Sequence, residues 1–290
     1  MSTPGSEDRS EARTGASVGA RPEGVIDRDL DAALATFAAA PARVVALDFD
    51  GVLAPIVPRP EDAAALPASR AALERLARDP GTHLGLVSGR AIGDPALRRA
   101  APPSTAIIGS HGAEQGLVDE QGQVAAGPPV LDDEQQALMR RLREETATLT
   151  ATVAGSWAEE KPTAIVVHTR PVSDAAAAAA LERDAVDRFG SLPGVRAIAG
   201  KRVVELSVAH VTKGDAVALL RTGFPTRELP AGTPVLYIGD DVTDEDALRT
   251  LGPEDIGIKV GGGETAARYR LASPDAVADL LDRLASLAGV

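Results

Sequence analysis

The chain has 290 residues, of which 44% are hydrophobic, 25% charged and only 2% aromatic, with a formal net charge of −12 and no cysteine. Such an acidic, aromatic-poor chain is repelled by nucleic-acid backbones and by anionic lipid surfaces, so we expect no partner of either kind. The lack of cysteine excludes disulfides, thiol catalysis and thiolate metal sites, and no apolar run approaches the roughly 20 residues of a membrane-spanning helix. We therefore expect a cytoplasmic protein.

The first 24 residues are rich in charged and turn-forming residues and lack the apolar stretch of a secretory signal. We expect a disordered tail over residues 1–24. Apolar residues at helical spacing then predict a helix over 25–40, which Pro41 ends.

Short apolar segments alternate with helical segments over most of the remaining chain. Near-continuous apolar runs of this kind are typical of parallel strands that helices cover on both faces. The alternation predicts an α/β fold with a doubly wound parallel sheet. The expected strands lie at 43–50, 83–90, 105–114 and 233–241, and the expected helices at 69–80, 94–101 and 211–222.

The middle of the chain differs, because the strands expected at 163–170 and 201–208 partly alternate apolar and polar residues. This pattern favours an antiparallel sheet with one open face. Two further helices are expected at 132–149 and 173–190. We predict an inserted α+β cap over 112–207, and a catalytic core made of 25–111 and 208–290.

The side chains that follow the apolar runs indicate the chemistry, since ligands of an open α/β sheet bind beyond the carboxyl ends of its strands. Asp48 and Asp50 follow the first run and project to the same side of an extended segment, with Gly51 allowing a sharp turn. Two such carboxylates repel each other and favour a bound cation. The alternative is a plain strand end with solvated acids and a turn glycine.

A second acidic group follows the last run, where Asp240 and Asp241 precede Thr243. Thr243 is expected to cap a helix, whose dipole would account for the acids at 244–246. Asp240 and Asp241 are not explained in this way. If they converge with Asp48 and Asp50, a hard cation such as Mg²⁺ is the natural counterion.

A site this acidic needs other groups to bind a phosphate. Ser88 ends the second run at an expected helix start, where a hydroxyl and free N–H groups form an anion site. Lys213 stands in the first turn of another expected helix, where its charge opposes the helix dipole unless it faces an anion. A plain helix cap at Ser88 and a solvated Lys213 are the alternatives.

Together these residues fit phosphoryl transfer through a carboxylate nucleophile. Asp48 would attack phosphorus, and Asp50 would protonate the leaving oxygen and later activate water. The cation, Lys213 and Ser88 would stabilise the phosphate oxygens.

In this order the motifs resemble those of the haloacid dehalogenase-like phosphatases, and more closely the trehalose-6-phosphate phosphatases, from about Val44 to the C-terminus. The resemblance implies an Mg²⁺-dependent hydrolase of trehalose biosynthesis that releases phosphate from trehalose 6-phosphate. It assigns Asp48, Asp50 and Asp240 to the metal, Asp48 and Asp50 to catalysis, and Ser88 and Lys213 to the phosphate. Asp241 and Asp244 would lie behind the metal ligands. Sugar binding or cap–core contact falls to Glu114, Glu159, Lys161, His168, Arg170 and Glu205.

Two residues depart from the family pattern. Val52 replaces the usual threonine after the glycine, and Thr169 replaces the tyrosine often found between His168 and Arg170. Two alternatives stay open: the same chemistry on another sugar phosphate, such as sucrose phosphate or mannosyl-3-phosphoglycerate, and a catalytically silent phosphosugar-binding protein. The intact pair of Asp48 and Asp50 argues against the silent protein.

Overall fold

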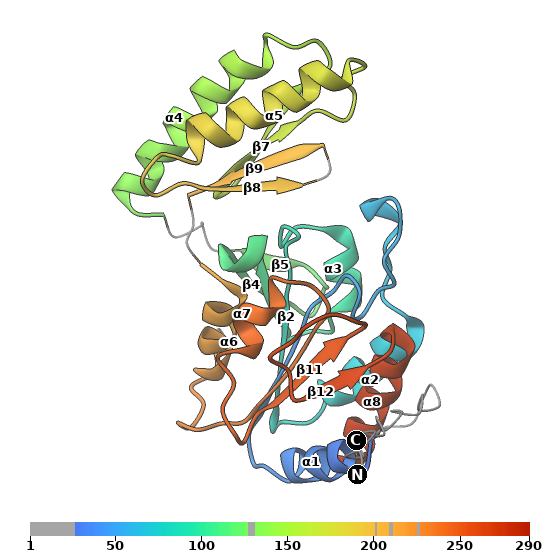
Figure 1. The fold of residues 1–290 in the computed structure, drawn as a ribbon. Coiled ribbons are helices and arrows are strands. Elements are labelled where there is room, and N and C mark those ends of the chain that lie inside the picture. Colours follow the sequence, from blue (N-terminus) through green and yellow to red (C-terminus); the bar gives the residue numbers. More distant parts are fainter. Residues whose placement is uncertain (1–26, 127–130, 201, 209–210, 225–226) are drawn as a thin grey trace, which may run out of the picture.

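The computed structural model describes residues 27–126, 131–200, 202–208, 211–224 and 227–290, so the expected tail over 1–24 lies outside the described residues. Two sheets organise this part of the chain (Figure 1). An eight-stranded sheet has the order β12-β11-β10-β1-β2-β3-β4-β5, and a four-stranded sheet has the order β6-β7-β9-β8. None of the described helices is both long and apolar enough to cross a membrane.

The eight-stranded sheet is parallel except at one edge, which confirms the predicted α/β core. Its parallel strands are β1 (Arg43–Leu47), β2 (Thr82–Val87), β3 (Ala106–Gly109), β10 (Val235–Gly239), β11 (Ile256–Val260) and β12 (Tyr269–Leu271). Two antiparallel strands, β4 (Glu114–Val118) and β5 (Val124–Ala126), extend the sheet beyond β3.

Helices cover both faces of this sheet, and β1 is completely buried between them. Val45 and Leu47 pack on one face, and Val44 and Ala46 pack on the other. The first face is covered by α1 (Arg28–Ala38), α2 (Pro67–Leu76), α3 (Pro95–Ala100) and α8 (Pro274–Leu287). The second face is covered by α6 (Lys213–Arg221) and α7 (Asp244–Leu248). Single-turn 3₁₀ helices, η1 (Pro60–Asp62) and η2 (Ser110–Gly112), lie in the connecting loops.

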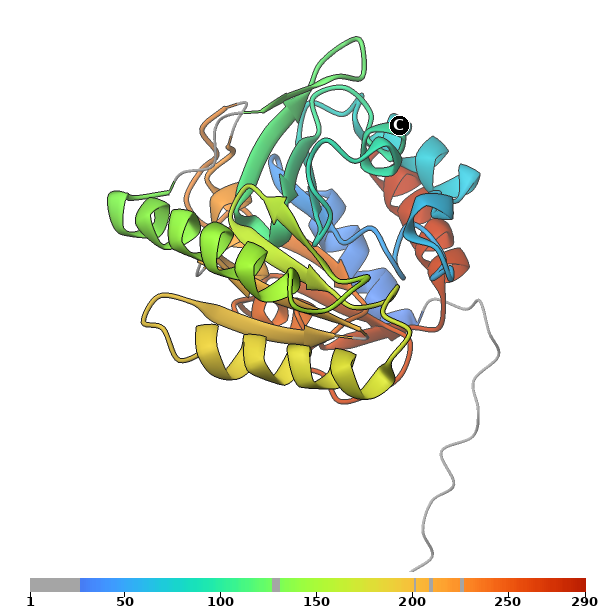
Figure 2. The same cartoon turned by 90° about the horizontal axis from the view of Figure 1, so that it is seen from above.

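The four-stranded sheet is antiparallel and, among the described residues, has helices on one face only, as the alternating pattern predicted. Its strands are β6 (Trp157–Lys161), β7 (Ala164–His168), β8 (Arg196–Gly200) and β9 (Val203–Ser207). Ile165 of β7 and Leu206 of β9 pack with Phe189 under α4 (Asp133–Thr150) and α5 (Ala175–Phe189). The helices run side by side on the side of this sheet away from the large sheet (Figures 1 and 2). The opposite face is therefore turned toward the core.

We expect the insertion to start at residue 112, but the first two strands beyond that residue extend the large sheet. Strands β4 and β5 pair with β3 and belong to the large sheet. Strand β4 alternates in burial as β9 of the small sheet does, because an antiparallel edge strand is also half covered. We propose that the inserted domain begins near α4 and ends near Ser207.

Candidate active site

Asp48 follows β1, Lys213 opens α6, and the fold joins them in a buried ion pair. Lys213 Nζ lies 2.6 Å from Oδ2 of Asp48 and 2.7 Å from Oδ1 of Asp244. Oδ1 of Asp48 accepts a 2.6 Å hydrogen bond from the N–H of Phe49. Asp48, Lys213 and Asp244 are 5%, 3% and 0% exposed, so Lys213 is not a solvated lysine.

Asp244 is the most constrained member of this cluster. Its Oδ1 also accepts a 2.6 Å hydrogen bond from the Tyr237 hydroxyl, and its Oδ2 accepts from the N–H groups of Asp240 and Asp241 at 3.0 and 2.9 Å. A carboxylate has about four lone-pair positions, and Lys213, Tyr237 and the two N–H groups occupy them. Asp244 therefore orients Lys213 and the turn after β10.

This arrangement corrects one expectation about the start of α7. The side chain of Thr243 makes no capping hydrogen bond. Asp244 accepts from the turn that precedes the helix, and Asp241 contributes its backbone while its side chain is exposed. The acid at 244 is thus held by buried donors, which the helix dipole alone does not explain.

Asp240 lies against the turn that follows β1. Gly51 has a φ of +74°, and a Cβ at this position would lie 2.0 Å from Oδ2 of Asp240. Both the backbone conformation and the close contact require glycine. Because β1 and β10 are neighbouring parallel strands, their carboxyl ends bring Asp48 and Asp240 together. One carboxylate oxygen from each of Asp48, Asp240 and Asp244 lies within 4.8 Å of the others.

The charges of this cluster are not balanced. Burial raises the pKa of Asp48 to about 7, the charge of Lys213 opposes the increase, and the charge of Asp244 adds to it. Burial and the charges of Asp244 and Asp241 raise the pKa of Asp240 to about 6. A divalent cation with oxygen ligands would supply the missing positive charge, and it would hold both acids in their ionised form. Asp48 and Asp240 fit such a cation; Asp244, whose lone pairs are taken, does not.

Asp50 is held in a second ion pair at the same edge of the sheet. Arg90 donates from Nε to Oδ2 of Asp50 at 2.6 Å and from Nη2 to Oδ1 at 2.8 Å. Arg90 also pairs with Asp94 at 3.0 Å, and its guanidinium carbon lies 5.1 Å from the centre of the Phe49 ring. The hydrogen bonds to Asp50 and Asp94 raise the pKa of Arg90.

Ser88 is buried in the turn after β2, and its Oγ accepts a 3.2 Å hydrogen bond from the N–H of Arg90. The expected helix start at this serine is wrong, because α3 begins at Pro95 and Asp94 caps it. Ser88 nevertheless lies at the carboxyl end of a strand next to β1.

Most of the expected cap residues lie on the face of the small sheet that is turned toward the core. Glu159 of β6 bonds His168 of β7 at 2.8 Å, and Lys161 of β6 bonds Glu205 of β9 at 3.0 Å. Arg170 lies beyond the end of β7 and is exposed. Glu114 is not part of this sheet. It begins β4 of the large sheet, is buried, and accepts a hydrogen bond from the Ser110 hydroxyl.

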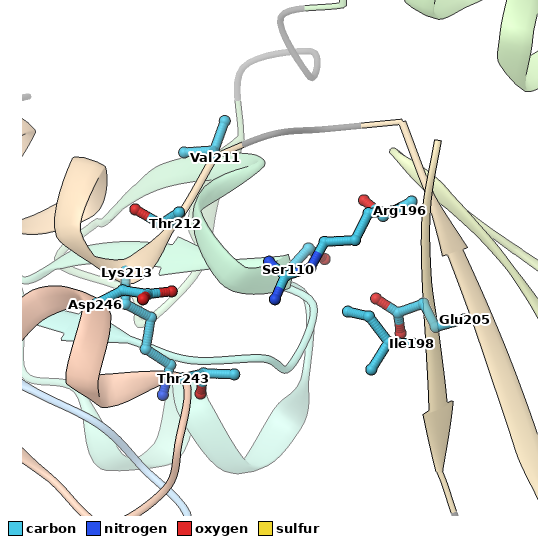
Figure 3. A pocket seen from close by; sticks show the side chains of 10 residues that line it. Ser110, Arg196, Ile198, Glu205, Val211, Thr212, Lys213, Thr243 and Asp246 are labelled. Carbon is cyan, nitrogen blue, oxygen red and sulfur yellow. The ribbon is translucent and has the colours of Figure 1, made fainter. Parts of the chain in front are cut away.

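A pocket between the two sheets joins cap and core side chains (Figure 3). Glu205 reaches it from β9 and Lys213 reaches it from α6, so two residues singled out in the sequence line one pocket. The cap also contributes Arg196, Ile198 and Ser207, and the large domain contributes Ser110, Val211, Thr212, Thr243 and Asp246.

Sequence reasoning missed the parts played by Arg90 and Tyr237. Arg90 is two residues beyond Ser88, where a long cation at a strand end can reach a neighbouring strand end. Tyr237 lies in a buried apolar strand, and a buried tyrosine hydroxyl usually needs a hydrogen-bond partner. Both signals point to a partner but do not identify it.

Comparison with known proteins supports a family for this chain. The family model described as trehalose-phosphatase matches residues 46–275. A probable trehalose-phosphate phosphatase of Sinorhizobium fredii is 37% identical over 196 residues, which cover 66% of this chain and 67% of that protein. The trehalose-phosphate phosphatase of Mycobacterium marinum is 32% identical over 238 residues, which cover 78% of this chain. The match spans only 57% of the length of that mycobacterial protein.

Among solved structures, the trehalose-6-phosphate phosphatase of Aspergillus fumigatus superimposes with a TM-score of 0.63 at 24% identity, over 92% of this chain and 99% of that one. This similarity establishes the shared fold of core and cap. The family match extends from β1, through the acids that follow β1 and β10, to the start of α8. The chain therefore belongs to the trehalose-phosphatase family.

Proposed function

We propose that this chain hydrolyses trehalose 6-phosphate to trehalose and inorganic phosphate. The single observation that carries the proposal is the buried cluster in which Lys213 joins Asp48 to Asp244 beside Asp240. This cluster supports Asp48 as the nucleophile, Lys213 as the cation beside it, and a divalent metal held by Asp48 and Asp240. The names of the relatives supply the substrate.

In the first step, an oxygen of Asp48 attacks phosphorus while the bond from phosphorus to the sugar oxygen breaks. An aspartyl-phosphate forms, and protonated Asp50 gives its proton to the departing sugar oxygen. Arg90 holds both oxygens of Asp50 in the described arrangement. Asp50 must therefore rotate away from Arg90 before it can reach the substrate.

In the second step, Asp50 takes a proton from a water molecule, and the resulting hydroxide attacks phosphorus. The bond between phosphorus and Asp48 breaks, phosphate leaves, and Asp48 is restored. Lys213, the hydroxyl of Ser88 and the N–H groups of the turn after β1 bind the phosphate oxygens in both steps.

Mg²⁺ bound to the carboxylates of Asp48 and Asp240 and to the backbone carbonyl of Asp50 would neutralise negative charge on the phosphate. Asp241 and Asp244 would hold the ligands in place from behind. Nucleophilic attack, proton transfer and the remaining phosphate contacts are supplied by groups of the protein itself.

The test is phosphate release by the purified chain with Mg²⁺. We expect kcat/KM for trehalose 6-phosphate to exceed that for sucrose phosphate, mannosyl-3-phosphoglycerate and hexose phosphates, because the cap contacts the sugar. If kcat/KM were higher for one of those esters, that ester would be the preferred substrate, and the proposed phosphatase reaction would still hold. If the chain released phosphate neither from these esters nor from an aryl phosphate, the proposed phosphatase activity would be refuted. A catalytically silent phosphosugar-binding protein would then be favoured.

A further inference from the structure

Trp157 is the only tryptophan of the chain, and it is 48% exposed at the start of β6. Its ring stacks on the imidazole of His168, with the ring centres 4.2 Å apart and the planes inclined by 7°. His168 is in turn held by Glu159, at 2.8 Å from Nε2 to Oε2. The indole is therefore fixed in orientation, with one face covered and the rest accessible.

Trp157 lies on the same face of the small sheet as the pocket residue Glu205, the face that α4 and α5 do not cover. Trp157 pairs with His168 and His168 pairs with Val203, while the next row on the same face contains Glu159, Val166 and Glu205. Because side chains alternate along a strand, both rows face away from α4 and α5. Glu205 lines the pocket that also contains Lys213 (Figure 3). Trp157 thus lies on the cap face that is turned toward the phosphate site.

The separation on this face corresponds to more than one sugar ring. Trp157 is two strands and one row away from Glu205. With strands about 5 Å apart and two residues rising about 7 Å, the two positions are roughly 12 Å apart. A single pyranose does not span this distance, but two linked rings do.

The chemistry of this face suits a sugar. A flat aromatic ring offers an apolar surface to the C–H face of a pyranose, and polar groups around it bind the hydroxyl groups. Glu159, Lys161 and Glu205 provide acceptors and donors on the same face. Such a mixed surface distinguishes a sugar site from an isolated exposed tryptophan, which would need no explanation.

We propose that Trp157, supported by His168, is the stacking platform for the sugar ring farther from the phosphate, and that it selects sugar phosphates with two rings over those with one. This inference rests on the proposed function and adds a specificity-determining residue to it. Phosphate chemistry at Asp48 does not depend on this platform.

Tryptophan fluorescence gives a direct binding test, because all of it comes from Trp157. We expect titration of the Asp48→Asn chain with trehalose to change the emission in a saturable way, and glucose at the same concentrations to leave it unchanged. No change with trehalose, or an equal change with glucose, would overturn the proposal. Trehalose carries no phosphate, so this test does not require catalysis.

Kinetics provide the second test, with Trp157→Ala, Trp157→Phe and, as matched control, Glu160→Ala. Glu160 lies on the same strand but bonds Arg143 of α4 on the other face, at 2.7 Å. We expect Trp157→Ala to lower kcat/KM for trehalose 6-phosphate about 10-fold, with no change for glucose 6-phosphate or an aryl phosphate. Trp157→Phe should retain most of the rate, and Glu160→Ala all of it.

An equal loss on all three esters would indicate a structural role for Trp157 and overturn the proposal, as would an unchanged rate with trehalose 6-phosphate. A native chain that fails to hydrolyse trehalose 6-phosphate yet hydrolyses the aryl ester would contradict the proposed substrate, and the fluorescence titration would then still decide whether Trp157 binds a disaccharide.

Discussion

Strand β1 has a buried charged side chain near each end. The charge at the amino end is balanced by a partner, and the charge at the carboxyl end lies in an excess of acids. At its amino end, Arg43 is 4% exposed, pairs with Asp79, and donates to the carbonyl oxygens of Ala38 and Ala40 at 2.6 Å each. At its carboxyl end, Asp48 shares Lys213 with Asp244 and lies beside Asp240.

The pKa values of the acids at the two ends of β1 shift in opposite directions. Burial alone raises the pKa of Asp79, but hydrogen bonds from Thr82 and Gly81 and the nearby Arg43 outweigh it and hold the pKa below its usual value. At the other end, burial and like charges raise the pKa of Asp48 and Asp240. Removing one partner from a balanced buried pair destabilises the fold, whereas an excess of buried acids favours a bound cation.

The largest expected effect comes from removing the carboxylate of Asp48, the proposed nucleophile. Asp48→Asn should lower kcat for phosphate release by roughly 10⁴-fold or more, because the amide cannot form the aspartyl-phosphate. The midpoint of thermal unfolding should stay the same or rise, since one buried like charge disappears and Lys213 keeps Asp244.

Both quantities are needed for this variant. Unfolding is measured on a metal-free preparation, and phosphate release on the same preparation after Mg²⁺ is added, with circular dichroism to follow the helices. Appreciable turnover by Asp48→Asn would refute its role as nucleophile. A strong loss of stability would mean that the carboxyl end of β1 is as balanced as the amino end.

A smaller effect is expected from Gly51→Ala. The new Cβ would meet the Asp240 carboxylate, so that acid must move, and we expect activity and metal affinity to fall about 10- to 100-fold. Gly122→Ala is the control, because Gly122 has a φ of +70° but nothing within 4 Å of the added atom. Both variants should lose about 1–2 kcal/mol of stability through the left-handed backbone. Equal activity in the two would argue against a site at Asp240.

Binding of the proposed Mg²⁺ should stabilise the carboxyl end of β1 and not its amino end. Mg²⁺ at about 100 times its dissociation constant should raise the free energy of unfolding by about 2.7 kcal/mol, and excess chelator should reverse the gain. The gain should shrink in Asp48→Asn and stay the same in Asp79→Asn. Denaturant unfolding with and without Mg²⁺ measures both, and an unchanged gain in Asp48→Asn would place the metal elsewhere.

How far the sequence predicts this molecule depends on the range of each interaction. The α/β alternation and the acids at strand ends are local patterns, so the parallel sheet and the position of Asp48 follow from them. The sequence patterns do not predict the order of the strands in the sheet. Any order that places β10 beside β1, however, brings Asp240 close to Asp48.

The remaining features depend on long-range pairing. Whether the hairpin of β4 and β5 joins the large or the small sheet is decided by hydrogen bonds to β3, and local periodicity is the same in both cases. Similarly, Asp244 has the pattern of an exposed first-turn acid, and only the positions of Lys213 and Tyr237 make it the buried centre of the cluster. The role proposed for Trp157 could not be predicted from the sequence either, because it depends on the stacking of its ring on His168 of the neighbouring strand.

The smallest expected effect tests the amino end of β1. Asp79→Asn should lower the free energy of unfolding by about 1–2 kcal/mol at pH 7, because Arg43 loses its charged partner but keeps its carbonyl acceptors. Catalysis per folded molecule should not change, since Asp79 lies at the opposite end of the strand from Asp48.

The pH dependence of that loss follows from the lowered pKa of Asp79. Above the unfolded value of 3.8 the carboxylate is ionised in both states, and its full stabilisation is present. As the pH falls below 3.8, the unfolded chain binds a proton that the folded chain does not, so the stabilisation decreases. The difference between native chain and variant, measured by urea unfolding from pH 7 to pH 3, should therefore shrink only at the acid end. A loss that is constant over this range would mean that Asp79 acts through hydrogen-bond acceptors that the amide lacks at every pH, and not through its charge.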